Sequence, residues 1–170
     1  ESGTGKELIA QFIHANSPRR EKPWVPVNCA AIPESLMESE MFGHVAGAFT
    51  GANRSKEGLL ETANDGSLFL DELAEMPMSI QAKLLRVLQD GVLRRVGSTQ
   101  TDAVVAVRFI AATNRDPHQA IEEQLLRKDL YYRLRVSPIH IPPRRERPED
   151  IRNLSGYYLR HFWTRARPYE

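Results

Sequence analysis

The sequence is poor in cysteine, in long apolar runs and in net charge, and each shortage excludes a class of protein. Cys29 is the single cysteine among 170 residues, which excludes an intrachain disulfide and a cysteine-rich zinc site. No apolar run approaches the roughly 20 residues that span a bilayer, and the N-terminus has no secretory pattern. A net charge of +1 provides no overall attraction to nucleic acid or to an anionic membrane. We therefore expect a cytoplasmic protein without membrane contact.

The length and composition indicate one folded domain. Of the 170 residues, 41% are apolar and 26% are charged, which is typical of a globular protein. A domain usually takes about 100 to 200 residues, so two large domains are excluded. The chain begins at Glu1 without a methionine, and no strand precedes its glycine-rich start. We expect it to be a fragment of a longer protein.

Apolar periodicity and local stop signals predict the helices and strands. Helical spacing is found over 7–16, 35–42, 58–62, 78–89 and 148–163, and after Asn114. Short apolar runs predict strands over 24–29, 67–70, 92–96, 104–112 and 139–141. Pro26 favours an edge or a bulge for the first of these strands. Helices that alternate with strands in this way indicate an α/β fold with a largely parallel sheet.

Polar side chains follow three of the predicted strands, at the points where they end. They are Asn28, Asp71, Glu72, Thr113 and Asn114. The ligands of parallel α/β sheets bind at the carboxyl ends of the strands. The pattern therefore predicts that these residues meet at one edge of the sheet, where a ligand binds.

Gly3, Gly5 and Lys6 precede the first predicted helix in the pattern of a phosphate loop. Glycines let backbone N–H groups turn around phosphates, the helix N-terminus favours anions, and the lysine reaches the terminal phosphates. The hydroxyl residue that usually follows the lysine and contacts magnesium is replaced by Glu7. A glycine turn that simply begins a helix is the alternative.

The second predicted strand ends in two carboxylates, Asp71 and Glu72. After a phosphate loop, such a strand end supplies Asp71 to hold magnesium and Glu72 to polarise the attacking water. An acidic helix cap is the alternative. Thr113 and Asn114 offer a hydroxyl and an amide to the γ-phosphate or the water, and Asn28 offers an amide to Glu72. An ordinary helix cap and a strand end are the alternatives for these three residues.

Five segments, 1–7, 47–52, 66–72, 111–115 and 129–134, together resemble the central AAA+ domain of sigma-54-dependent transcriptional activators, the bacterial enhancer-binding proteins. The resemblance covers essentially the whole chain. The hexapeptide at 47–52 is the most specific segment, since other AAA+ ATPases carry the phosphate loop and the acidic strand end without it. Glu7, unusual for a phosphate loop in general, matches the pattern of this family.

The resemblance implies an AAA+ P-loop NTPase fold that binds ATP with magnesium and hydrolyses ATP. It also implies assembly into a homo-oligomeric ring, usually a hexamer, that remodels the closed promoter complex of sigma-54 RNA polymerase. The nucleotide-binding residues that it implies are Ser2, Gly3, Thr4, Gly5, Lys6 and Glu7. The implied roles at the strand ends are magnesium binding for Asp71, water activation for Glu72, a switch contact to Glu72 for Asn28, and a first sensor for Thr113 and Asn114.

The resemblance also assigns the hexapeptide loop to sigma-54 binding. Its residues are Gly47, Ala48, Phe49, Thr50, Gly51 and Ala52. Phe49 and Thr50 would lie at the tip that touches sigma-54, and the segment 93–97 resembles the neighbouring pore loop. The composition alone leaves open whether Phe49 is exposed on a mobile loop or is packed inward in a buried turn.

Arg127 and Arg133 match the positions of arginines that reach into the nucleotide of the next subunit. An inserted guanidinium neutralises charge on the transferred phosphoryl group, although most arginines are simply surface residues. On a continuous helix, two residues six positions apart would point about 120° away from each other. We therefore expect the two arginines to have unequal roles.

The resemblance predicts an α/β core over 1–147 and the truncated start of a helical lid over 148–170, with Arg144 where the family has leucine. The second sensor arginine is expected to be absent, and promoter or enhancer DNA would bind only through a domain absent from this chain. Two other functions remain open. One is a generic AAA+ ATPase, such as a protein unfoldase, and the other is a module that binds nucleotide or sigma-54 without turnover.

The remaining reactive residue types predict no further chemistry. The histidines, which show no metal-ligand spacing, are His14, His44, His118, His140 and His161. We therefore expect no metal other than nucleotide-bound magnesium. Cys29 has no evident histidine partner and is expected to be a small buried thiol.

Overall fold

The computed structural model describes residues 3–166, with side chains described as far as residue 163. The chain forms two compact units. Gly5–Pro138 makes the larger unit, and the described residues at both ends, 3–4 and 139–166, make the smaller one. The predicted division at residue 147 has a different boundary and stays a prediction.

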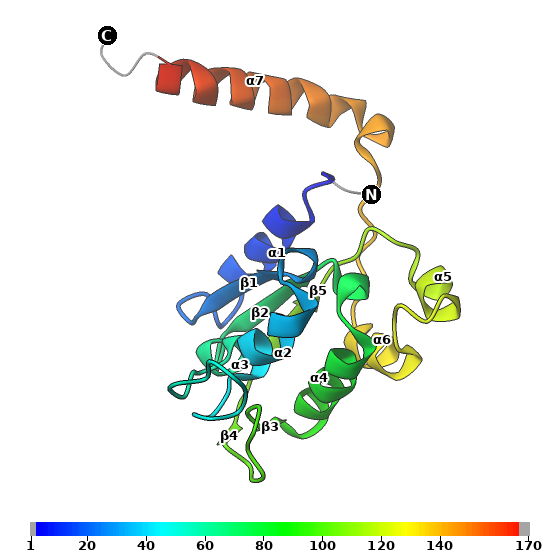
Figure 1. Cartoon of the computed structure of the whole chain (residues 1–170). Coiled ribbons are helices and arrows are strands. Elements are labelled where there is room, and N and C mark those ends of the chain that lie inside the picture. The colour runs from blue at the N-terminus through cyan, green and yellow to red at the C-terminus, as the bar shows by residue number, and fades with distance from the viewer. Residues whose placement is uncertain (1–2, 167–170) are drawn as a thin grey trace. The chain divides into compact units, whose positions relative to one another are not determined.

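A three-stranded parallel sheet lies within the larger unit (Figure 1). Its strands are β1 (Trp24–Asn28), β2 (Ser67–Asp71) and β5 (Arg108–Ala111), in the order β1-β2-β5. The first four residues of the central strand β2 are buried, as expected where both faces of a strand are covered. β1 is an edge strand of this sheet, which confirms the position that Pro26 predicts.

The helices match the predicted helical segments. Those of the larger unit are α1 (Lys6–Ala15), α2 (Glu34–Phe42), α3 (Leu59–Thr62), α4 (Met78–Asp90), α5 (Pro117–Glu122) and α6 (Lys128–Leu134). Helix α7 (Pro148–Ala166) belongs to the smaller unit. The pattern of apolar residues therefore located α1 to α4 and α7, whereas α5 and α6 were expected only as helical segments after Asn114.

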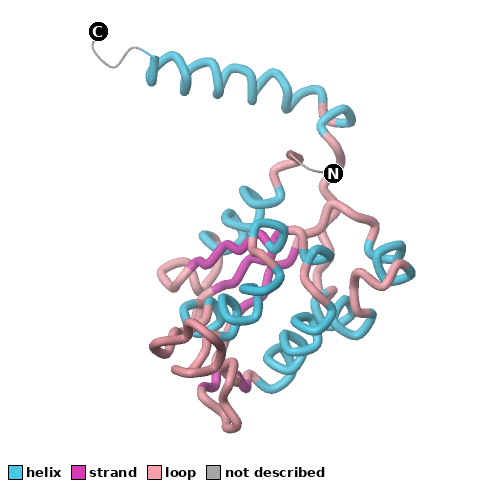
Figure 2. Tube along the Cα trace, viewed as in Figure 1, coloured by secondary structure: helices cyan, strands magenta, loops and turns pink. Residues whose placement is uncertain are grey.

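Two strand predictions are wrong, and the predicted strand over 92–96 is too long, since β3 ends at Leu93. The segment 104–112 does not form one strand, because β4 (Ala103–Val104) pairs antiparallel with β3 (Val92–Leu93), whereas β5 joins the main sheet (Figure 2). Between them, the N–H of Ala106 donates to the Asn64 side chain and not to a neighbouring strand. The segment 139–141 forms no strand. Prolines precede and follow it, and each proline lacks the N–H that a sheet requires.

One apolar core joins the sheet to the helices of the larger unit. Leu70 of β2, Met41 of α2, Leu84 of α4 and Leu130 of α6 are all completely buried in it. Burial of an aliphatic side chain of this size contributes about 1.5 to 3 kcal/mol. This packing holds the strand ends at fixed positions relative to the surrounding helices.

The loop that contains the hexapeptide is closed at its base by backbone hydrogen bonds. His44 and Lys56 donate N–H to each other's carbonyl oxygens at 3.0 and 2.9 Å. The N–H of Val45 donates to the carbonyl of Val96, and the N–H of Val96 donates to the carbonyl of Gly43, at 3.1 and 2.9 Å. Val96 belongs to the loop between β3 and β4, so the two loops share one base.

One ion pair anchors the loop between β3 and β4 to α3. Arg95 donates from Nε and Nη2 to the two carboxylate oxygens of Glu61, at 3.0 and 2.6 Å. The side chains are 22% and 12% exposed. A two-point pair that is mostly buried is stronger than an exposed one, so this contact helps to fix the loop.

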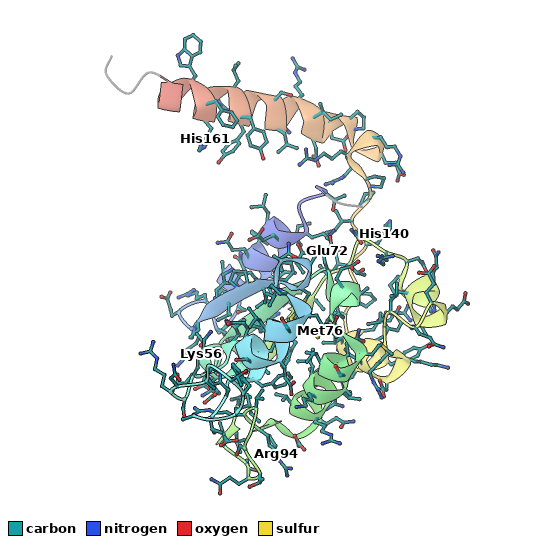
Figure 3. All side chains as sticks on the ribbon, in the orientation of Figure 1. Lys56, Glu72, Met76, Arg94, His140 and His161 are labelled. Carbon is teal, nitrogen blue, oxygen red and sulfur yellow. The ribbon has the colours of Figure 1, made fainter. Side chains whose placement is uncertain are left out.

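Arg95→Met is expected to lower the free energy of unfolding by about 2 kcal/mol, because the Glu61 carboxylate then stays mostly buried without its partner. Urea unfolding measures the loss. Arg94→Met is the control, since the neighbouring Arg94 is exposed (labelled in Figure 3). Equal losses in the two variants would show that the ion pair has no specific role.

Candidate functional site

The predicted residues at the strand ends converge on one edge of the sheet. Asn28 stands opposite Asp71 in the register of β1 and β2. Ala111 of β5 stands opposite Leu70 of β2, so the chain after β5 leaves the sheet at the same edge. The N–H of Leu73 donates to the carbonyl of Ala112 at 3.0 Å, which keeps the two chains together beyond the strands.

Lys6 reaches this edge from the first turn of α1. Its Nζ lies 3.6 Å from Oε1 of Glu72, and the two side chains are only 13% and 15% exposed. Gly5 caps α1 with a φ of 97°, in the left-handed region that residues with a Cβ avoid. Among the described atoms, none beyond the chain neighbours lies within 4 Å of a Cβ built on Gly5. The backbone conformation, and not a lack of space, therefore requires glycine at this position.

Glu72 has an unusual backbone conformation and a carboxylate held from two sides. Its φ of 53° and ψ of 49° are left-handed, which is rare for a residue with a side chain and is often found at functional sites. Its Oε2 accepts the backbone N–H of Asn114 at 3.2 Å, while Oε1 faces Lys6. Its own N–H donates to Oδ1 of Asp71 at 3.1 Å. The sharp turn after β2 therefore directs the Glu72 carboxylate towards Lys6.

Thr113 and Asn28 make contacts to their own neighbouring backbone, as expected if they only cap a helix or end a strand. Oγ1 of Thr113 accepts the N–H of Arg115 at 3.1 Å, and Oδ1 of Asn28 accepts the N–H of Ala30 at 2.9 Å. Both are turn or cap interactions. The sensor role of Thr113 and the switch contact from Asn28 to Glu72 stay predictions.

The other residues predicted for the phosphate loop lie on both sides of Gly5 and Lys6 in the sequence. Ser2 lies outside the described residues. Gly3, with a φ of 73°, and Thr4 belong to the smaller unit, in which Arg147 donates from Nη2 to the Thr4 carbonyl at 3.1 Å. Glu7 lies in the first turn of α1, where a carboxylate is favoured by the helix dipole. The role of these residues in nucleotide binding stays a prediction.

The continuous helix considered for Arg127 and Arg133 does not exist. Arg127 is the N-cap of α6 and has extended backbone angles, whereas Arg133 lies inside the helix. Arg127 donates from Nε and Nη2 to the carboxylate of Asp129 at 3.0 and 2.7 Å, and this contact raises the pKa of Arg127. Arg133 donates to the carbonyl of Leu88 at 3.3 Å. The two guanidinium groups thus have different surroundings, while their unequal roles stay a prediction.

Phe49 is both packed and exposed, which answers the question that composition left open. Its ring lies edge-on to the imidazole of His44, with 5.0 Å between the centroids, yet the residue remains 42% exposed. Thr50 is exposed, whereas Ala52 is buried. The loop therefore presents part of the Phe49 ring and the Thr50 hydroxyl at the surface.

The sequence patterns did not single out two buried polar residues, His44 and Gln81. His44 is buried beneath Phe49, with Nδ1 2.7 Å from Ser39 Oγ and Nε2 3.1 Å from the Arg54 carbonyl. Gln81 is completely buried in α4. The signal for Gln81 was present, because a polar side chain occupied the apolar stripe of an amphipathic helix.

Cys29 lies beside the strand ends and is buried, as predicted. Burial, followed by the negative charge of Asp71, raises the pKa of the Cys29 thiol to about 12. A thiol in this state is a poor nucleophile. No group of three or more His, Cys, Asp or Glu residues in the described part of the chain has the arrangement of a metal site.

Together, the glycine-capped α1, the lysine in its first turn and the acidic end of the central strand define a P-loop domain of the AAA+ class. The fold agrees with this class. The closed state of Hsp104 aligns with 78% of this chain at a TM-score of 0.56 and 19% identity, a likeness that concerns the fold alone. Across the described residues, no helix is both long and apolar enough to cross a membrane.

The model of the sigma-54 interaction domain family matches residues 1–140, and the chain therefore belongs to this family. It is 55% identical to the regulatory protein AtoC of Escherichia coli over 162 residues, which cover 95% of this chain and 35% of AtoC. It is 58% identical to the anaerobic nitric oxide reductase transcription regulator NorR of Aeromonas salmonicida over 158 residues, covering 93% of this chain and 31% of NorR. The chain thus spans about a third of the length of these curated relatives.

Solved structures of a related protein show the same fold. NtrX from Brucella abortus aligns with 97% of this chain, and 37% of its own, at a TM-score of 0.89 and 41% identity. NtrX in complex with ATP aligns with a TM-score of 0.87. The family and the fold class that the motifs suggested are confirmed.

Proposed function

We propose that this chain is the ATP-binding and ATP-hydrolysing domain of a transcriptional activator that remodels closed complexes of sigma-54 RNA polymerase. The observation that carries the proposal is the convergence of Lys6, Asp71 and Glu72 at the end of β2. Membership of the sigma-54 interaction domain family and the ATP complex of the related NtrX support it.

The phosphates of ATP would bind at the N-terminus of α1, where backbone N–H groups and Lys6 provide positive charge. Magnesium fits the carboxylate of Asp71, because this ion is usually held by one or two carboxylates together with the phosphates of the substrate. Bound magnesium would neutralise charge on those phosphates. Asp71 is held in place through its hydrogen bond from the N–H of Glu72.

Glu72 would act as the base that polarises the attacking water. Its carboxylate is oriented by the N–H of Asn114 and by the ammonium of Lys6. A base must lie within hydrogen-bond reach of the water, which itself must lie next to the γ-phosphate. The position of Glu72 beside the phosphate-binding lysine supports this role.

Contacts with other macromolecules complete the proposal. The exposed parts of Phe49 and Thr50 would touch sigma-54. The chain would assemble into a ring, usually a hexamer in the resembled family, in which a second copy would receive Arg127 or Arg133 at its nucleotide. DNA would bind through a separate domain. A cytoplasmic location follows from a function in transcription.

Thr50→Ala is expected to weaken sigma-54 binding at least about tenfold, because Thr50 would lie at the tip of the loop that touches sigma-54 and its exposed hydroxyl would be lost from that contact. ATP turnover is expected to be unchanged, since Thr50 lies on a loop apart from Lys6 and Glu72. Anisotropy of labelled sigma-54 and phosphate release measure the two effects in the longest natural chain that contains this sequence. Ser137→Ala removes another exposed hydroxyl and is the control.

The same measurements separate the two alternatives. A wild-type protein that hydrolyses ATP but does not bind sigma-54 would be a generic AAA+ ATPase. One that binds ATP and releases no phosphate at any protein concentration would be a binding module. Turnover per subunit that rises with protein concentration would support a site shared between copies.

A further inference from the structure

Gln81 is a polar side chain with no exposed surface in the core of the larger unit. It lies in the first half of α4, on the face that also carries the buried residues Leu84 and Ile80. A buried amide costs free energy unless its polar atoms are hydrogen-bonded. An apolar side chain would fill such a position at no such cost, so the contacts of the amide indicate why it is there.

The amide of Gln81 makes three hydrogen bonds to the backbone of two other segments. Its Nε2 donates to the carbonyls of Met76 and Leu125, at 2.7 and 2.8 Å. Its Oε1 accepts the N–H of Arg127 at 2.9 Å. Both N–H groups and the carbonyl oxygen are therefore used, and a single side chain connects Met76 to the segment that ends at Arg127.

The segment that ends at Met76 begins at Glu72. A 3-10 turn, Leu73–Glu75, joins the two residues. The N–H of Glu75 donates to the carbonyl of Glu72 at 2.9 Å, and the N–H of Met76 donates to the carbonyl of Leu73 at 3.1 Å. Glu72 and Met76 are both labelled in Figure 3. This hydrogen-bonded turn links the Glu72 backbone to the amide of Gln81.

Arg127 is anchored at both its backbone and its side chain. As the N-cap of α6, it has an N–H that precedes the helical hydrogen bonds, and Gln81 accepts this N–H. Its guanidinium is held by Asp129. The position of the Arg127 backbone thus depends on Gln81, and the direction of its guanidinium depends on Asp129.

We infer that Gln81 is a positioning residue for ATP hydrolysis. It sets the backbone of Arg127 at a defined position relative to Glu72, so that each copy presents its arginine to the nucleotide of a neighbouring copy in a fixed geometry. The inference rests on the proposed function for Arg127 and adds the residue through which that arginine is held.

The test uses Gln81→Met in the longest natural chain that contains this sequence, since methionine keeps the length of the side chain and removes all three hydrogen bonds. At protein concentrations that saturate assembly, kcat for ATP is expected to fall about tenfold or more, because small displacements of a catalytic group have large effects on rate. The KM for ATP is expected to be unchanged. Gln89→Met, at an exposed position of the same helix, is expected to have no effect.

A double-mutant cycle with Arg127→Ala shows whether Gln81 acts through Arg127 or only stabilises the fold. If Gln81 acts through Arg127, then Gln81→Met lowers kcat no further once Arg127 is alanine. A full additional loss in the Arg127→Ala background would overturn the inference, as would a folded Gln81→Met variant with wild-type kcat. An Arg127→Ala variant with wild-type kcat would reject the role proposed for Arg127 at the neighbouring nucleotide, and the inference with it, whereas turnover against protein concentration separately tests whether the site is shared.

Gln81→Asn provides the same test if Gln81→Met does not fold. Asparagine keeps the amide but is one methylene shorter, so it cannot reach all three backbone partners. The expected result is again a loss of kcat that disappears in the Arg127→Ala background. Persistence of the loss in that background would overturn the inference.

Discussion

Glu72→Gln is expected to lower ATP turnover at least about 100-fold, the usual contribution of a general base. Glutamine keeps the size of the side chain and an oxygen that can accept the N–H of Asn114, but it has no charge with which to polarise water. Lys6 loses a carboxylate 3.6 Å from its ammonium. ATP binding is therefore expected to remain at least as tight as in the wild type.

Phosphate release and titration with a fluorescent ATP analogue separate these two effects. Glu75→Gln is the matched control, because Glu75 follows the same strand but pairs with Arg115 at 2.8 Å and is partly exposed. A Glu72→Gln variant with wild-type turnover would remove Glu72 from the chemistry. Parallel losses in both variants would point to damage to the turn that follows β2.

Gly58→Ala is expected to lower the free energy of unfolding by about 3 kcal/mol, the upper part of the range for overpacking. A Cβ at Gly58 would lie under 3.0 Å from three backbone atoms, namely the Gly43 nitrogen, the Met41 carbonyl oxygen and the Phe42 carbonyl carbon. Backbone at the end of α2 cannot move aside as a flexible side chain can. The close approach of Gly58 to Gly43 also forms the base of the hexapeptide loop.

Gly156→Ala is the control for this change and is expected to act in the opposite direction. Gly156 lies inside α7. Among the described residues, no atom outside the neighbouring helix backbone lies within 4 Å of a Cβ added to Gly156. Alanine in a helix interior is favoured over glycine by about 0.5 to 1 kcal/mol. Urea unfolding measures both variants, and a loss of similar size in each would contradict the steric explanation for Gly58.

Local patterns were sufficient to locate most of the helices and to predict the convergence of the strand ends. Periodicity identifies an amphipathic helix such as α4 without knowledge of its partners, and parallel strands must bring their carboxyl ends to one edge. The patterns failed where pairing depends on distant residues. Whether 104–112 is one strand or two depends on the pairing of β4 with β3 and of β5 with β2, which no local window contains.

The sequence by itself determined which residue types were available for chemistry and how they are spaced. Gly5, Lys6, Asp71 and Glu72 fit the pattern of the class, and the hexapeptide at 47–52 is the most specific segment of the resemblance to the family, whose model matches residues 1–140. These signals are local because phosphate binding and strand ends use consecutive residues.

Only the tertiary structure decided how these groups are held. The left-handed backbone of Glu72, the contact of Phe49 with His44 and the three hydrogen bonds of Gln81 all depend on the surrounding fold. The Gln81 bonds join segments far apart in the chain, and a buried amide is stable only when such partners are present. The 3.6-residue periodicity of α4 indicates that position 81 faces the core. The hydrogen-bond partners of Gln81 are instead specified by the packing of α4 against the segments before and after it.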